Sequence, residues 1–175
     1  MKYLITVLMV FALITIGCKK NSTDSDNVGE IMEHSTVNVK TATEYFSFTN
    51  NSGSTDEAAA HDIVFFAIQW QPAPQAPVIW DPRFKAKDGM SIAVLKDTKL
   101  EDVTEVPASG DFVTNYTTET DDWYYTNDDH LVLSHENVWI VNTADGKFPA
   151  FEITNYYDEQ GESGVHTIEW KYLSD

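Results

Sequence analysis

The sequence predicts an all-β protein, folded as a single antiparallel β-sandwich or meander. Short apolar runs rich in β-branched and aromatic residues recur along the chain, and turn-forming clusters such as NNSGS, PASG and EQGESG separate them. Aromatic residues make up 13% of the chain, which suits the half-buried surface of a pleated sheet. The sequence shows no long amphipathic helical pattern. We therefore expect one β domain over residues 36–175.

The first 17 residues have the pattern of a secretory signal peptide. Lys2 precedes the apolar run YLITVLMVFALITIG, which is shorter than the roughly 20 apolar residues of a membrane-spanning helix. The run ends at Gly17-Cys18, a small residue before a cysteine, as at the cleavage site of a bacterial lipoprotein. Cys18 is the only cysteine, so lipidation would explain its presence. The alternatives are an ordinary signal peptide with an accidental cysteine, or an uncleaved anchor.

The segment from Cys18 to residue 35 is expected to be a flexible, polar and acidic tether between the lipid and the domain. The remaining chain has the length of one domain. The whole chain carries 11 basic against 28 acidic residues, a net charge of −17. Such a surface repels phosphate backbones, so we expect no nucleic-acid partner.

Three antiparallel pairings are predicted in the C-terminal third. A four-residue polar loop, Ser134–Asn137, separates two apolar runs, and Asp145-Gly146 in the turn Ala144–Gly146 is a strong hairpin signal. Two glycines, Gly161 and Gly164, lie in the third connection. The segments expected to pair are 131–133 with 138–141, 138–142 with 148–154, and 151–157 with 166–173.

The segment Gln69–Lys87 is expected to leave the sheet as a loop or a polyproline-like excursion. Its prolines cannot donate ladder hydrogen bonds. It also carries Trp70, Trp80 and Phe84, which are large apolar side chains for a loop. These side chains either fold back over the sheet as a lid or form the wall of a ligand pocket. The prolines are Pro72, Pro74, Pro77 and Pro82.

The sequence contains no nucleophile elbow, P-loop, zinc-ligand spacing or glycine-rich dinucleotide turn. We therefore expect no enzyme, no catalytic residues and no metal-ion site. His130 and His135 bracket one predicted strand, but five extended residues span roughly 16 Å and their odd offset places them on opposite faces. Two imidazoles on one iron need nitrogens only about 4 Å apart. The two histidines are expected to be solvated turn residues, and if they act as ligands, a single histidine is favoured over a pair.

The C-terminal sequence VWIVNTADGKFPAFEITNYYDEQGESGVHTIEWKY resembles the closing region of the HmuY family of Bacteroidota lipoproteins. The matching features are the turn Thr143–Lys147, the tyrosines Tyr156-Tyr157, and a closing strand that runs from Thr167 through Trp170 to Tyr172. Upstream, the YFSF run that starts at Tyr45 resembles a family strand. The HDIVF run that starts at His61 resembles the family's WDIAF strand, with histidine in place of tryptophan. The resemblance covers roughly residues 36–173.

This resemblance implies an all-β lipoprotein of the outer membrane, exposed at the cell surface, that captures haem for a TonB-dependent transporter. The paired histidines of the founding member do not carry over. Only His130 falls near a ligand region, and the use of methionine by some relatives draws attention to Met90. The resemblance thus implies His130 or His135 as the haem ligand with Met90 as partner. The implied porphyrin-covering side chains are Trp70, Trp80 and Phe84.

The sequence also departs from the family. The Asn- and Gly-rich segment that follows the family's WDIAF strand is absent, and Gln69–Lys87 stands in its place. The alternative function is therefore a non-haem interaction or structural lipoprotein that docks on a membrane or on a surface partner.

Overall fold

The computed structural model describes residues 28–118 and 123–174. The expected signal peptide (residues 1–17) and the expected lipidation site Cys18 lie outside these residues. The described chain is almost entirely strand and turn, with two short 3₁₀ helices, η1 (Leu100–Asp102) and η2 (Ser109–Asp111). The strands are β1 (Met32–Ser35), β2 (Glu44–Ser47), β3 (Ser52–Ser54), β4 (Ile63–Trp70), β5 (Ile79–Ala86), β6 (Ser91–Leu95), β7 (Val113–Thr114), β8 (Tyr124–Thr126), β9 (Val132–Ser134), β10 (Val138–Asn142), β11 (Pro149–Tyr157) and β12 (Ser163–Tyr172).

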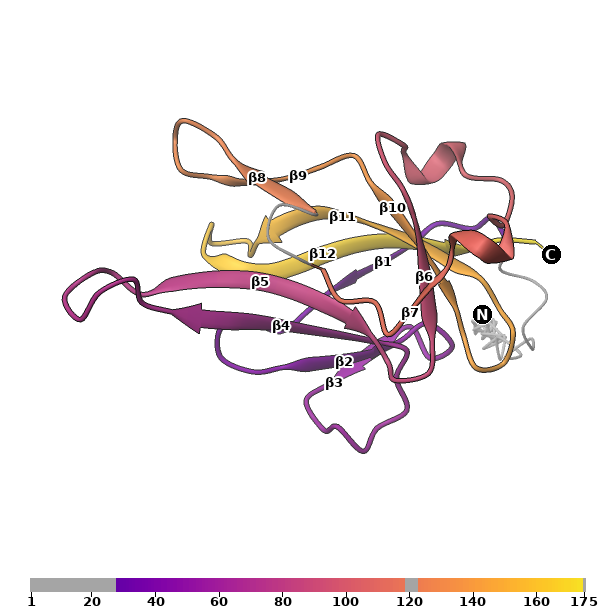
Figure 1. Ribbon diagram of the computed structural model, residues 1–175, viewed down its shortest axis with the longest axis horizontal. Coiled ribbons are helices and arrows are strands. Elements are labelled where there is room, and N and C mark those ends of the chain that lie inside the picture. The colour runs from indigo at the N-terminus through magenta and orange to yellow at the C-terminus, as the bar shows by residue number, and fades with distance from the viewer. Residues whose placement is uncertain (1–27, 119–122, 175) are drawn as a thin grey trace, which may run out of the picture.

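Two antiparallel sheets form the body of the protein (Figure 1). A six-stranded sheet has the order β1-β12-β11-β10-β6-β7, and a four-stranded sheet has the order β3-β2-β4-β5. The strands β8 and β9 form a separate hairpin. The all-β fold expected from the sequence is therefore confirmed.

Aromatic side chains fill the space between the two sheets. Phe84 of β5 meets Trp139 of β10 at a centroid distance of 5.1 Å and Phe151 of β11 at 5.2 Å, both edge to face. Phe48 and Trp170 form a similar pair at 5.1 Å. All five side chains are almost completely buried. Edge-to-face pairs of this kind stabilise a core beyond the burial of their area, so aromatic packing holds the sandwich together.

Two of the three predicted pairings are confirmed. β10 and β11 pair across the turn that contains Gly146, whose φ of +78° suits glycine. β11 and β12 pair along most of their length. The predicted hairpin around Ser134–Asn137 is wrong, because β9 pairs with β8 while β10 pairs with β6 and β11. A backbone hydrogen bond of 2.8 Å from His135 to the carbonyl of Trp123 continues the β8–β9 pairing and leads the chain away from β10.

The expectation that Gln69–Lys87 leaves the sheet is also wrong, since β4 and β5 pair over their full length from Ile63↔Ala86 to Trp70↔Ile79. Pro82 is accommodated because β5 is the last named strand of its sheet. The backbone N–H and C=O of Phe84 both bond to Thr118, on the side away from β4. The backbone nitrogen of Pro82, two residues earlier in β5, points to the same side as that of Phe84. The N–H that proline lacks would therefore not have bonded to β4.

The N-terminal boundary of the domain also differs from the expectation. Residues 32–35, which the sequence assigned to the flexible tether, form β1 and pair with β12. Val28 already bridges to Tyr172. Strand pairing therefore begins before residue 36. No helix within the described ranges is long and apolar enough to cross a membrane.

Candidate functional site

Two β-hairpins extend from the sandwich toward the same end of the molecule, at the left of Figure 1. The first, here called the β4–β5 arm, comprises residues 67–82, the distal halves of β4 and β5 with their connecting turn. The second, the β8–β9 arm, comprises residues 123–135. The β4–β5 arm continues beyond the other strands in Figure 1, whereas the β8–β9 arm lies beside β11, where the backbone N–H of Val132 donates a hydrogen bond of 2.7 Å to the hydroxyl of Tyr157.

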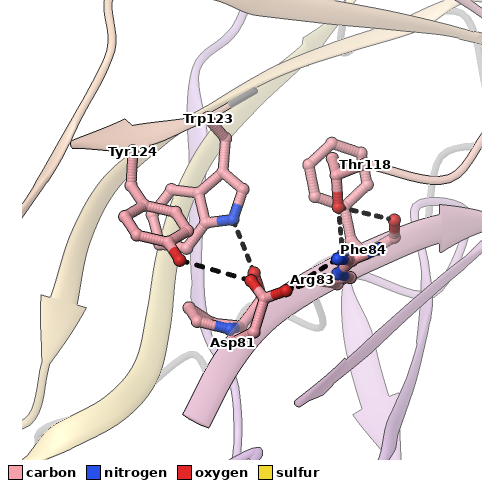
Figure 2. Close-up of polar contacts among 7 residues, drawn as sticks. Asp81, Arg83, Phe84, Thr118, Trp123 and Tyr124 are labelled. Atoms are coloured by element: carbon pink, nitrogen blue, oxygen red, sulfur yellow. Dashed lines mark hydrogen bonds and ion pairs between the residues drawn. The ribbon is translucent and has the colours of Figure 1, made fainter. Parts of the chain in front are cut away.

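Polar contacts join the arms at their base (Figure 2). The indole nitrogen of Trp123 donates a hydrogen bond of 2.9 Å to the carbonyl oxygen of Pro82. The hydroxyl of Tyr124 donates to Asp81 Oδ1 at 3.2 Å. Asp81 is buried, and the Arg83 guanidinium donates to its Oδ2 at 2.7 Å and 2.8 Å, which compensates the carboxylate charge. The base of the β8–β9 arm is thus fixed to the edge of β5.

Beyond this junction the arms carry exposed apolar side chains. On the β8–β9 arm, Tyr125 and Leu131 are each 45% exposed. On the β4–β5 arm, Trp70 is 49% exposed, and Ile79 lies directly opposite it. Large apolar groups gathered on a surface commonly mark a binding site. The exposed set on the β4–β5 arm is Ile68, Trp70, Val78 and Ile79.

The three expected pocket-wall residues do not form one wall. Trp70 pairs with Ile79 and Trp80 pairs with Gln69, so the two tryptophans project from opposite faces of the β4–β5 arm. Trp80 shares its face with Phe84 because side chains alternate along β5. Phe84 is completely buried in the core, so it does not line a ligand pocket. Trp70 and Trp80 remain accessible, one on each face.

The two candidate histidines lie at different places on the β8–β9 arm. His130 is exposed at the turn, where its φ of +62° is in the left-handed region and its N–H bonds to the carbonyl of Asn127. His135 follows β9 and is half-buried, with its ring 5.2 Å from that of Tyr125. His130 precedes β9 and His135 follows it, and ligation by a single histidine stays a prediction.

The third haem-ligand candidate does not fit. Met90 is only 6% exposed and packs in the core cluster between the sheets. Met90 follows the C-terminal end of β5, whereas the β4–β5 arm contains the N-terminal end of that strand. The structure therefore does not bring Met90 to His130 or His135, and an iron site shared between them would need the core to open.

Two other histidines have roles that the sequence analysis missed. His34, assigned to the tether, lies on β1 and contacts Glu44 at 2.6 Å. His166 is completely buried on β12. The alternation of His166, Ile168 and Trp170 along one face was the available signal for its burial.

The surroundings of His166 are aromatic. Its ring lies 5.0 Å from that of Trp123, 5.1 Å from Tyr156 and 5.3 Å from Phe65. Neither ring nitrogen has a hydrogen-bond partner in the part of the chain that the structure describes. Burial lowers the pKa of His166 to about 3, so the ring is neutral at physiological pH. Burial also raises the pKa of Tyr156.

Comparison with solved structures identifies the fold. The chain superimposes on apo PinO from Porphyromonas gingivitis with a TM-score of 0.54 and 13% identity, covering 83% of this chain and 98% of that one. The apo HmuY analog of Tannerella forsythia gives a TM-score of 0.52 and 13% identity, covering 86% and 100%. A Bacteroides fragilis protein described as a lipoprotein gives 0.52 and 10% identity, covering 87% and 93%.

No protein-family model and no curated protein matches the sequence. The similarity therefore lies in the fold, and the chain has the HmuY-like fold that its closing strands suggested.

Proposed function

We propose that this chain is a non-enzymatic, lipid-anchored binding protein of the cell envelope that captures an apolar planar ligand on its two arms. Haem is the candidate ligand, and a TonB-dependent outer-membrane transporter is the candidate recipient. The observation that carries this proposal is the junction of two hairpins at their base, with the exposed Tyr125 and Leu131 on one arm and the accessible Trp80 on the other. The fold similarity to a HmuY analog supports the choice of ligand class.

The orientation of the domain supports capture at a membrane surface. The described chain begins at Val28, which bridges to Tyr172 at the C-terminal end of β12. That end of β12 lies opposite to the arms in Figure 1. A lipid on Cys18 would therefore attach the domain to the membrane at the end that holds Val28 and Tyr172. The arms would then be directed away from the membrane. The location that we propose is the outer membrane, with the domain exposed at the cell surface.

Haem would need an axial histidine and an apolar cover for the porphyrin. His130 is an exposed imidazole at the turn of the β8–β9 arm, beside the exposed Leu131. Trp80 lies on the face of the β4–β5 arm that continues from the core face of β5. Aromatic faces stack on flat conjugated ligands, and imidazole nitrogen is a common iron ligand. We assign His130 as the iron ligand.

Haemin titration of the purified full chain, followed by its absorption spectrum, tests the assignment. The wild type is expected to shift the Soret band, and His130→Ala is expected to lose that shift. His135→Ala and Met90→Leu are the matched controls, because the His135 ring packs at a tilt against that of Tyr125 and Met90 is buried in the core. Both controls should retain the wild-type spectrum. Equal spectra for the wild type and His130→Ala would reject His130 as ligand.

A second function is favoured by one observation. Trp70 and Ile79 form an exposed cross-strand pair on the face of the β4–β5 arm opposite to Trp80. A flat apolar pair suits docking on a protein partner without any haem. Absence of a Soret shift in the wild type would favour this interaction or structural role over haem capture.

A further inference from the structure

A cavity lies on the outer face of the four-stranded sheet, away from the core. Its volume is about 280 Å³. It belongs to neither face of the β8–β9 arm, and it is independent of the function proposed above. The residues that line it are Thr43, Tyr45, Glu57, His61, Val64, Phe66, Lys85, Lys87 and Asp88.

The strand register explains why these side chains meet. Tyr45 pairs with Val64, and Val64 pairs with Lys85, so these side chains form one row across β2, β4 and β5. Phe66 lies two residues along β4 on the same face and extends the apolar floor. Val64 is buried and Phe66 is half-buried. The cavity therefore has an apolar floor between a tyrosine and a lysine.

Basic side chains are concentrated beside this floor. Arg83, Lys85 and Lys87 stand at every second position, which places them on one face of the extended chain. Arg83 is bound to Asp81. No ion pair joins Lys85 or Lys87 to another described residue. These two ammonium groups stand beside the apolar floor, and two carboxylates, Glu57 and Asp88, belong to the same lining.

His61 closes one side of the cavity in a fixed orientation. Its Nδ1 lies 2.9 Å from the carbonyl oxygen of Ala59, which can only accept, so Nδ1 carries the proton and donates. The ring is held edge to face with Tyr45 at 5.0 Å. Nε2 is thus left with its lone pair in the neutral ring. Two exposed carboxylates, Glu57 and Asp88, complete the lining.

We propose that this cavity binds a small organic monocarboxylate with an aromatic or branched apolar body. The apolar body lies on Val64 and Phe66, and the carboxylate is held by Lys85 and Lys87 through charge-assisted hydrogen bonds. The volume accommodates a molecule of the size of a single aromatic ring with a short side chain. Glu57 and Asp88 exclude ligands with several negative charges by repulsion.

A ligand-observed NMR titration of the full chain tests this assignment with two probes of matched shape. Phenylpropionate carries the carboxylate, and phenylpropionamide replaces it with a neutral amide. We expect the acid to bind about tenfold more tightly than the amide, because charge-assisted hydrogen bonds contribute more than neutral ones. Binding of both probes should be lost in Phe66→Ala.

The variant that isolates the charge is Lys85→Gln with Lys87→Gln. It should bring the acid to the affinity of the amide while leaving the amide unchanged. Lys96→Gln makes the same kind of charge change at an exposed position after β6, in the other sheet, and should leave the tenfold preference intact. No binding of phenylpropionate by the wild type, or a tenfold preference for the acid that persists in the double variant, would overturn the proposal. Neither result depends on haem, so it leaves the function proposed for the arms unaffected.

Discussion

His34 Nε2 and Glu44 Oε1 lie 2.6 Å apart, and this pair connects β1 of the six-stranded sheet to β2 of the four-stranded sheet. Glu44 is buried at 2% exposure, and its second oxygen accepts the backbone N–H of Val37. A buried carboxylate needs partners of this kind to offset its loss of water. The first strand of the domain is thus attached at the sheet edge and also across the sandwich.

Removal of this contact should destabilise the domain. His34→Ala leaves the Glu44 carboxylate buried with one described partner fewer, and we expect a loss of about 2–3 kcal/mol in the free energy of unfolding. Urea denaturation measures it. His135→Ala is the control, since that histidine is half-buried and has no carboxylate partner among the described residues. Equal midpoints for the two variants would show that the pair contributes no net stability.

Gly53 is required beside the same carboxylate. A Cβ built at Gly53 would lie 2.0 Å from Glu44 Oε1, so Gly53→Ala must displace the carboxylate from His34. We expect a loss of about 1–3 kcal/mol, typical of overpacking. Gly110→Ala is the matched control, because a Cβ there meets nothing within 4 Å. Gly53→Ala and His34→Ala both disturb the contact between Glu44 and His34. The loss in the free energy of unfolding in the double variant should therefore be smaller than the sum of the two single losses.

Acid should destabilise the protein through His166. Its pKa is about 3 in the folded protein and ordinarily 6.5, so the unfolded chain binds the proton more readily. The contribution of the neutral ring is complete above pH 6.5 and is lost as the pH falls from 6.5 toward 3. At pH 5 the loss is about 2 kcal/mol. The check is the pH dependence of unfolding in the wild type and in His166→Leu.

The variant should show a flatter stability profile between pH 7 and pH 5 than the wild type. The difference between the two profiles isolates His166 from other groups, such as the half-buried Asp62 and Glu152, whose pKa values partial burial raises. Parallel profiles would mean that His166 does not cause the loss of stability between pH 7 and pH 5.

The anchor can be tested without reference to the fold. If Cys18 is acylated, Cys18→Ser should release the protein from the membrane fraction and reduce its mass by that of the lipid. Fractionation and mass spectrometry of the wild type and variant provide the measurement. An unchanged mass and an unchanged membrane association would contradict lipidation.

Local turn chemistry was predictable from the sequence, but the choice of strand partners was not. The β10–β11 turn follows from Asp145-Gly146, whose conformational preferences act over a few residues. The prediction for Ser134–Asn137 failed because adjacency in sequence favoured a hairpin, whereas β10 is a central strand that takes partners from distant parts of the chain. Such pairing depends on which surfaces become buried together, and this cannot be predicted from one amino-acid sequence.

The same limit explains the misjudged site residues. Counting prolines in Gln69–Lys87 predicted a loop, but the effect of Pro82 depends on which side of β5 its nitrogen faces. Met90 was attractive as a sulfur ligand, yet its burial follows from the packing of both sheets. The exposed tryptophan on the arm, Trp70, was within reach of prediction because it adjoins the turn residues.

The junction at Asp81 and Trp123 separates two parts of the protein with different tolerance to sequence change. Most large aromatic groups of the core lie on the sandwich side, and substitutions there would cost several kcal/mol each. Distal positions such as Ile68, Trp70 and Leu131 are exposed and contribute little to that core. The arms can therefore acquire a new ligand preference in a few substitutions while the scaffold stays folded, which makes this architecture readily adaptable during evolution.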